Sequence, residues 1–189
     1  MIQVAMIFAA GRGERMRPLT DVTPKPLLKV AGKPLIVWQI EALARAGIRQ
    51  IVINHAWLGE QISEHLGDGD EFGVQLYYSA EQTALETAGG IANALRMLQL
   101  LSDSPIFLAV SGDVYTDYDY EQLHSVADEL ARASEPHMHL IMVDNPEFHP
   151  QGDFVLHEDG VLYPRDDTHG RALTFGNIGL YDMRQFEDI

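Results

Sequence analysis

Cysteine is absent from this chain of 189 residues. Its absence excludes disulfide bonds, thiolate metal sites and cysteine nucleophiles. The sequence also lacks any apolar run near the roughly 18 residues that a membrane-spanning helix needs. Residues 1–10 are apolar but have no basic leader, so they do not resemble a signal peptide. We therefore expect a cytoplasmic protein with no membrane partner, organised as one domain.

Basic residues are also scarce. Thirteen lysines and arginines stand against 28 aspartates and glutamates, which gives a net charge of −15. A nucleic-acid-binding protein is expected to be basic, because its affinity comes from neutralising phosphates, so this balance argues against that class. The few bases are gathered, since all three lysines lie within residues 25–33. Such a segment suits a small polyanion, and an unevenly charged solvated surface is the alternative.

Apolar runs of strand length alternate with amphipathic helical segments along most of the chain. Four repeats of this alternation predict βαβ units and an α/β, Rossmann-like fold: a mostly parallel sheet with helices on both faces. Ligands bind at the carboxyl ends of the strands in such folds. The strands are expected at residues 2–9, 48–54, 74–79, 105–110, 138–143 and 173–181, the helices at 34–46, 58–66, 87–101 and 119–132, and a hairpin at 154–163.

The loop after the first expected strand contains Gly11 and Gly13, followed by Arg15. Two glycines at this spacing let backbone N–H groups approach a phosphate, and the arginine can add charge-assisted contacts. The third glycine of a dinucleotide fingerprint is missing, because position 16 is Met. A flexible surface turn is the alternative to a phosphate-binding loop.

Two further positions have the chemistry of a phosphate site. Lys25 lies between Pro24 and Pro26, which predicts a stiff, extended backbone that fixes the lysine before a ligand arrives. Asp113 follows an apolar strand directly, where a carboxylate can bind Mg²⁺ together with substrate phosphates. The alternatives are a solvated lysine in a proline loop and an aspartate that caps a turn.

Three segments near the N-terminus match one pattern together: Gly11-x-Gly13-Glu14-Arg15-Met16-x-Pro18-Leu19-Thr20, Pro24-Lys25-Pro26-Leu27 and Gly32-Lys33-Pro34-Leu35-Ile36. This combination resembles the signature of sugar-1-phosphate nucleotidyltransferases. Residues 53–59, 85–90, 112–114 and 143–146 resemble most closely the branch of uridylyltransferases that act on N-acetylmuramic acid 1-phosphate in cell-wall recycling. Mannose-1-phosphate guanylyltransferases and other NDP-sugar pyrophosphorylases are the near alternatives.

The resemblance implies a nucleotidyltransferase fold of the glycosyltransferase-A type that transfers UMP from UTP to a sugar 1-phosphate and releases pyrophosphate, with Mg²⁺ as the cofactor. Arg15, Lys25 and Asp113 match catalytic positions, and Asp113 also matches a metal ligand. The matching nucleotide-binding positions are Ala10, Gly11, Gly13, Glu14, Arg15, Lys25, Glu81, Thr87, Ala88 and Gly89, and the matching sugar-binding positions are Asn145, Gly152 and Asp153.

One departure from the family pattern concerns the metal. The family carries a later Asp-Val-Gly-Thr-like segment whose aspartate is a second protein ligand, and no such segment occurs up to Ile189. We therefore expect a single nucleotidyltransferase domain over residues 1–189 that lacks the family's C-terminal segment. Two alternatives follow: a shortened enzyme, or a non-catalytic protein that binds nucleotide or sugar phosphate.

Overall fold

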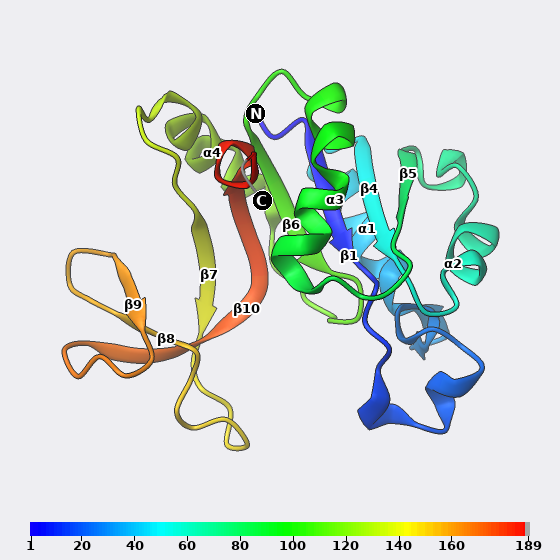
Figure 1. The fold of residues 1–189 in the computed structure, drawn as a ribbon, viewed down its shortest axis with the longest axis horizontal. Helices are drawn as coiled ribbons and strands as arrows, with labels where there is room; N and C mark the ends of the chain where they lie inside the picture. The colour runs from blue at the N-terminus through cyan, green and yellow to red at the C-terminus, as the bar shows by residue number, and fades with distance from the viewer. Residues whose placement is uncertain (188–189) are drawn as a thin grey trace.

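A single eight-stranded sheet organises the computed structural model, which describes residues 1–187 (Figure 1). The strand order is β5-β4-β1-β6-β10-β8-β9, and β7 also pairs with β10. The strands are β1 (Val4–Phe8), β4 (Gln50–His55), β5 (Gln75–Ala80), β6 (Ile106–Ser111), β7 (His139–Val143), β8 (Phe154–Leu156), β9 (Leu162–Pro164) and β10 (Arg171–Asp182). Strands β1, β4, β5 and β6 pair in parallel, so their carboxyl ends meet at one edge.

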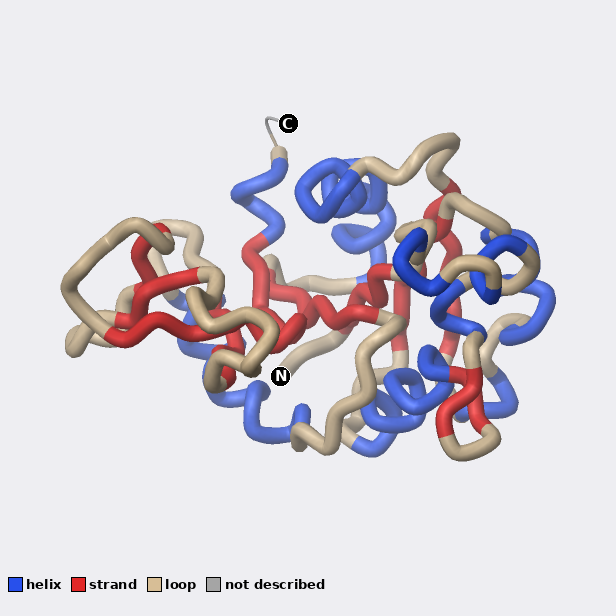
Figure 2. Tube along the Cα trace, turned by 90° about the horizontal axis from the view of Figure 1, so that it is seen from below, coloured by secondary structure: helices blue, strands red, loops and turns tan. Residues whose placement is uncertain are grey.

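Helices cover both faces of the parallel strands, as the sequence predicts (Figure 2). They are α1 (Leu35–Arg45), α2 (Gly59–Leu66), α3 (Glu86–Leu101) and α4 (Leu123–Arg132). The side chains of β1 alternate between the two faces: Ala5 and Ile7 pack with α1, α2 and α4, whereas Val4 and Met6 pack with α3. Within residues 1–187, no helix is both long enough and apolar enough to cross a membrane.

The C-terminal strands are antiparallel, which strand–helix alternation could not predict for this part of the chain. Strand β10 runs antiparallel to β6, β7 and β8, and β8 and β9 form the expected hairpin. The register between β10 and β7 shifts between Phe175 and Gly179, at a β-bulge. Residues 144–175, which we call the arm, extend away from the helices at this bend (Figure 1).

Short elements account for the remaining differences from the sequence-based expectation. A two-stranded hairpin of β2 (Lys29–Val30) and β3 (Lys33–Pro34) precedes α1 and was not predicted. Its two-residue turn holds Ala31 and Gly32, with φ of 51° and 82°. The helix expected from residue 119 begins as a 3-10 turn, Tyr120–Gln122, and the Asp119 side chain caps it by accepting from the Glu121 N–H.

Candidate active site

A cavity of about 400 Å³ opens at the carboxyl ends of the parallel strands. Segments that follow β1, β5 and β6 contribute to it. It is lined by Phe8, Ala9, Ala10, Gly11, Arg12, Lys25, Pro26, Asn54, Ala84, Glu86, Thr87, Ser111 and Asp113. A second hollow of about 330 Å³ shares Gly11, Lys25 and Asp113 with the first and adds Gly13, Glu14, Arg15 and Met16. Eight of the predicted site residues therefore line one or both spaces.

The glycine loop has one position that requires glycine and one that does not. Gly13 has φ +67°, and a Cβ there would lie 3.0 Å from Thr20 Cγ2 and 3.1 Å from Lys25 Cβ. Its carbonyl accepts from the Met16 N–H at 2.9 Å and from Thr20 Oγ1 at 2.9 Å. A Cβ at Gly11 would meet nothing within 4 Å. Gly13 therefore allows the tight turn that packs the loop against Thr20 and Lys25, whereas Gly11 leaves open space at the cavity.

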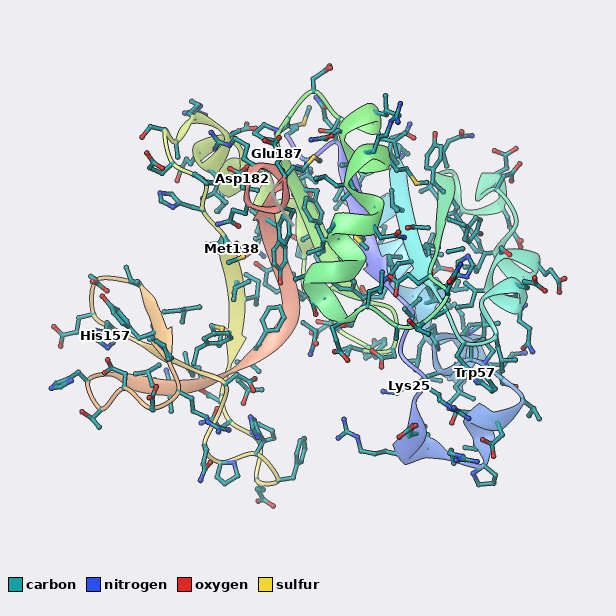
Figure 3. All side chains as sticks on the ribbon, in the orientation of Figure 1. Lys25, Trp57, Met138, His157, Asp182 and Glu187 are labelled. Atoms are coloured by element: carbon teal, nitrogen blue, oxygen red, sulfur yellow. The ribbon has the colours of Figure 1, made fainter. Side chains whose placement is uncertain are left out.

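Arg12 is a cavity-lining cation that the sequence reasoning did not single out. Its guanidinium lies over the Trp57 ring, 4.4 Å from the ring centroid. Trp57 Nε1 donates to the Thr20 carbonyl at 3.1 Å, which ties the residues after β4 to the glycine loop. Figure 3 shows Trp57 and Lys25 at the same end of the molecule, where the parallel strands finish. The only sequence signal for Arg12 is its place between Gly11 and Gly13. Its contact with Trp57 could not be predicted, because the two residues are far apart in the sequence.

Lys25 and Asp113 meet across 88 residues of sequence, with Lys25 Nζ 2.5 Å from Asp113 Oδ2. Each side chain is about 30% exposed, so the pair faces the cavity and not the core. The expectation of an extended backbone at Lys25 is wrong, because this residue begins the 3-10 turn Lys25–Leu27. Pro26 occupies the second position of that turn, where its fixed φ fits and its missing N–H costs no hydrogen bond.

The loop that carries Asp113 is fixed on both sides of this residue. The Gly112 N–H donates to the Phe8 carbonyl at 2.9 Å, and a Cβ at Gly112 would lie 2.9 Å from Ile7 Cγ2. On the other side, Gln39 Nε2 donates to the Val114 carbonyl at 2.6 Å. The buried Tyr120 hydroxyl donates to Gln39 Oε1 at 2.5 Å, and its burial raises the pKa of this phenol, which keeps it a donor.

A buried hydrogen-bond relay joins the ends of three strands and the start of α3. The Ala9 N–H donates to Asn54 Oδ1 at 2.9 Å, and Asn54 Nδ2 donates to Glu81 Oε1 at 2.7 Å. The other carboxylate oxygen of Glu81 accepts from the Leu85 N–H at 2.9 Å. Glu81 is only 8% exposed, so this side chain supports the cavity wall instead of lining it. Of the other residues predicted to contact the base, Thr87 lines the cavity, whereas Ala88 and Gly89 do not.

The three residues predicted to bind sugar lie together on the arm, but none of them lines the cavity. Asn145 Oδ1 accepts from Thr174 Oγ1 at 2.8 Å, and a Cβ at Gly152 would lie 2.7 Å from the same oxygen. Asp153 accepts from the Phe175 N–H at 2.8 Å and pairs with His149 at 3.0 Å. The trio therefore fastens the loop between β7 and β8 onto β10.

Asn177, which sequence reasoning missed, lies at the β10 bulge beside the cavity. It has φ +60°, and Ser111 Oγ, a group of the cavity wall, donates to its Oδ1 at 3.2 Å. Bulges often re-aim side chains next to functional sites. A non-glycine residue with positive φ cannot be recognised in a strand sequence, so this position carried no signal.

His55 lies beside the Glu81 relay, at the end of β4, and lines a third hollow of about 440 Å³. Burial lowers the pKa of this imidazole, and the nearby Glu81 and Glu60 carboxylates oppose the shift. A Cβ at Gly59 would lie 1.9 Å from His55 Nδ1. The ring thus occupies space that only a glycine at the start of α2 leaves free.

The donor set suits a metal that arrives with a phosphate ligand better than one held by protein alone. Within residues 1–187, no group of three or more His, Asp or Glu side chains is placed to hold a metal ion. Asp113 offers one carboxylate at a strand end, next to the space that the glycine loop surrounds. Mg²⁺ is commonly bound through one or two carboxylates together with substrate phosphates and water, so the residues fit that ion.

The family model and the curated relatives agree on one family. A family model described as nucleotidyl transferase matches residues 4–148. N-acetylmuramate alpha-1-phosphate uridylyltransferase of Neisseria meningitidis serogroup B is 52% identical over 186 residues, covering 98% of this chain and 78% of that protein. The mannose-1-phosphate guanylyltransferase catalytic subunit beta of Drosophila pseudoobscura is 41% identical over 120 residues, covering 63% of this chain and 32% of that protein. The fold resembles HddC from Yersinia pseudotuberculosis, with a TM-score of 0.76 at 20% identity, covering 100% of this chain and 80% of the other.

Proposed function

The chain belongs to the nucleotidyl transferase family, and we propose that it transfers UMP from UTP to a sugar 1-phosphate, releasing pyrophosphate. N-acetylmuramic acid 1-phosphate is the acceptor we favour, because the Neisseria meningitidis relative named for that substrate covers nearly the whole chain. The product is then a UDP-sugar of cell-wall recycling, formed in the cytoplasm, where nucleoside triphosphates are available. The observation that carries this proposal is the Lys25–Asp113 pair at the mouth of the glycine loop.

The cations around the cavity support a triphosphate on this side. Arg12 and Lys25 line the first space and Arg15 lines the second, within an otherwise strongly acidic chain. Backbone N–H groups of residues 11–13 add donors that need no side chain. We assign Ala10, Gly11, Gly13 and Glu14 to the walls of this phosphate site, and Arg15 and Lys25 to charge stabilisation of the transferred group.

The reaction is an in-line displacement at the α-phosphorus of UTP. A phosphate oxygen of the sugar 1-phosphate forms the new P–O bond as the bond to pyrophosphate breaks, and the electron pair leaves with pyrophosphate. This nucleophile needs no general base, because a phosphate monoester with a second pKa near 6 is largely ionised at neutral pH. The protein's work is therefore positioning and charge stabilisation, with Lys25 holding the phosphates against the glycine loop.

Asp113 would hold the divalent cation, which we propose to be Mg²⁺. When bound, such an ion neutralises phosphate charge and orients the oxygens around the reacting phosphorus. Lys25 pairs with Asp113 in the absence of substrate, and it can transfer its hydrogen bonds to an incoming phosphate that arrives with the cation. The pair thus puts a phosphate-binding cation and a candidate metal ligand side by side at the phosphate site.

The nucleoside and sugar occupy opposite sides of this phosphate site in the proposal. We place the base against Thr87, which lines the cavity, with Ala88 and Gly89 in the helix turn behind it. Glu81 fixes that wall through Asn54 and Leu85. We place the sugar towards the loop between β7 and β8, where Asn145, Gly152 and Asp153 set the backbone course.

The test is pyrophosphate release in the presence of Mg²⁺. UTP, GTP and dTTP are each combined with N-acetylmuramic acid, glucose and mannose 1-phosphates. Release with UTP and the muramic acid phosphate alone is the expected result. Release with GTP and mannose 1-phosphate favours the second candidate, which the Drosophila relative motivates. If UTP raises the Tm but no pyrophosphate is released, the chain binds the nucleotide and does not turn it over. If UTP neither raises the Tm nor yields pyrophosphate, the proposal fails.

A further inference from the structure

Glu86, the first residue of α3, has an unusual backbone conformation. Its φ is +59°, in the left-handed region that L side chains rarely adopt. The other non-glycine residues with positive φ in the described chain are Ala31, Leu58 and Asn177. Ala31 belongs to a two-residue hairpin turn that demands this conformation, and asparagine tolerates it. Glutamate is disfavoured at such a position, because its Cβ makes a positive φ costly. Glycine, which has no Cβ, would adopt this backbone conformation without strain.

Glu86 is also the one of these four residues that lines the main cavity. Within residues 1–187 its carboxylate takes part in no hydrogen bond or ion pair, so the local structure gives the side chain no internal partner. Residues with a strained backbone conformation occur often at functional sites, where the strain is part of the mechanism. A glutamate kept at a glycine-like position beside the cavity therefore points to a contact with substrate.

The charge of Glu86 decides which part of a nucleotide it can meet. A carboxylate accepts hydrogen bonds and repels phosphate unless a cation lies between them. Asp113 has Lys25 beside it, whereas no Lys or Arg side chain of residues 1–187 pairs with Glu86, so Glu86 is poorly suited to the triphosphate near Arg12 and Lys25. It belongs with Ala84 and Thr87 on the wall where the proposed function places the nucleoside. Two nucleoside groups can donate to it: a ribose hydroxyl and the N3–H of uracil.

We propose that the Glu86 carboxylate accepts a hydrogen bond from the nucleoside half of the substrate and is a specificity-determining residue. This assignment rests on the proposed function and extends it, because it names a chemical group by which one nucleotide is distinguished from its close analogues. Residue 86 lines the cavity in a strained backbone conformation, and glycine at this position would remove both the strain and the acceptor.

A purely structural role for Glu86 makes a different prediction. Acidic residues in the first turn of a helix are favourable because they face its positive end, so Glu86 could serve only to stabilise α3. In that case Glu86→Gln would lower the Tm and leave substrate discrimination unchanged. Under our proposal the same variant changes discrimination.

The experiment compares UTP, 2′-deoxy-UTP and 3-methyl-UTP with the full chain. Values of kcat/KM and, by calorimetry, Kd are measured for the wild type, Glu86→Gln and Glu86→Gly. Ala31→Gly is the matched control, because it relieves a positive φ in the β2–β3 turn at a residue that lines neither the cavity nor the second hollow. The Tm of Glu86→Gly is compared with that of Ala31→Gly.

The wild type is expected to disfavour one analogue by about tenfold or more, which is the scale of a lost hydrogen bond to a charged group. Glu86→Gly should lose that preference by binding UTP more weakly, and Glu86→Gln, which keeps a neutral acceptor, should reduce it, whereas Ala31→Gly should keep it. The 2′-deoxy arm identifies the ribose as the donor and the 3-methyl arm identifies the base. Glu86→Gly should hold or raise the Tm, as Ala31→Gly does.

Unchanged ratios for both analogues in both Glu86 variants would overturn the proposal. If the wild type binds UTP without turnover, the transferase function fails, and the Kd ratios still decide the role of Glu86. If no nucleotide binds to the wild type, both proposals fail.

Discussion

The parallel part of the sheet and the arm use polar side chains in opposite ways. In residues 1–132, Arg12, Lys25 and Asp113 present charge to a cavity, and buried groups such as Asn54 hold the walls behind them. On the arm, the side chains of Asn145 and Asp153 form hydrogen bonds with the arm's own backbone and side chains. One region is arranged for a ligand, and the other is arranged to keep a loop in shape.

This difference has a physical origin in the two sheet types. Parallel strands end together at one edge, so successive loops converge there and can build a cavity from distant segments. Antiparallel strands β8, β9 and β10 form a ribbon with little core of its own, so its loop needs side-chain bonds to stay ordered. The arm can therefore contribute to an acceptor site through backbone shape, and the parallel part through charge.

The largest effect is expected from Lys25→Ala, which removes the cation nearest the proposed reacting phosphate. Loss of one charge-stabilising donor typically lowers kcat by about 10²–10³-fold. Lys25 is partly exposed, so stability should change little. Steady-state pyrophosphate release, together with urea denaturation, tests both statements.

Lys33→Ala is the matched control for Lys25. Lys33 Nζ lies 2.5 Å from Glu41 Oε2, and these side chains are 29% and 35% exposed, close to the values for the Lys25–Asp113 pair. Lys33 lines neither the cavity nor the second hollow. Equal losses of turnover in the two variants would mean that Lys25 acts only through general charge.

Asn54→Leu should have the largest effect on stability. It leaves the Ala9 N–H and Glu81 Oε1 without their buried partner, at a cost of about 3 kcal/mol in the free energy of unfolding. Urea denaturation measures it. Asn93→Leu is the comparison, because its amide bonds Ser79 Oγ at an exposed position and its loss should cost well under half as much. Similar costs for both would mean that the relay is not a support of the cavity wall.

The sequence was sufficient for the parallel part because its signals are local. Apolar runs gave β1, β4, β5 and β6 within a residue or two of their ends, and glycine and proline marked the loops between them. The family resemblance drawn from residues 11–36 is confirmed by the match over residues 4–148. Gly11 and Asp113 could be named because each lies just after a recognisable strand end, and Lys25 because a proline flanks it on each side.

The remaining features depend on contacts between distant residues. The local sequence predicts neither the Lys25–Asp113 ion pair nor the position of Arg12 over Trp57. Glu81 was expected to contact nucleotide, but it is buried in a relay whose partner, Asn54, reads as an ordinary strand residue. The positive φ values at Glu86 and Asn177 could not be predicted either, because glutamate disfavours this conformation and asparagine adopts it only occasionally.

On the arm, Asn145→Ala should produce a smaller effect of a different kind. It removes the bond from Thr174 and the two bonds that the amide donates to the Pro150 and Ala172 carbonyls, at about 1 to 2 kcal/mol of stability. If this loop shapes the acceptor site, KM for the sugar 1-phosphate should rise severalfold, with KM for UTP unchanged. A parallel rise in both KM values would contradict the division between the two regions.

The smallest effect concerns His55, which borders the parallel part at α2. Burial lowers its folded-state pKa below the ordinary value of 6.5, so the unfolded chain binds the proton more readily. The contribution of neutral His55 to stability is therefore complete above pH 6.5 and declines as the pH falls through the folded-state pKa. His55→Gln should remove this decline, seen as a shallower loss of unfolding free energy between pH 7 and about 5 than in the wild type. The comparison with the wild type isolates the contribution of residue 55. Identical slopes would mean that the His55 ring is as well solvated in the folded chain as in the unfolded one, and that the space left by Gly59 does not bury it.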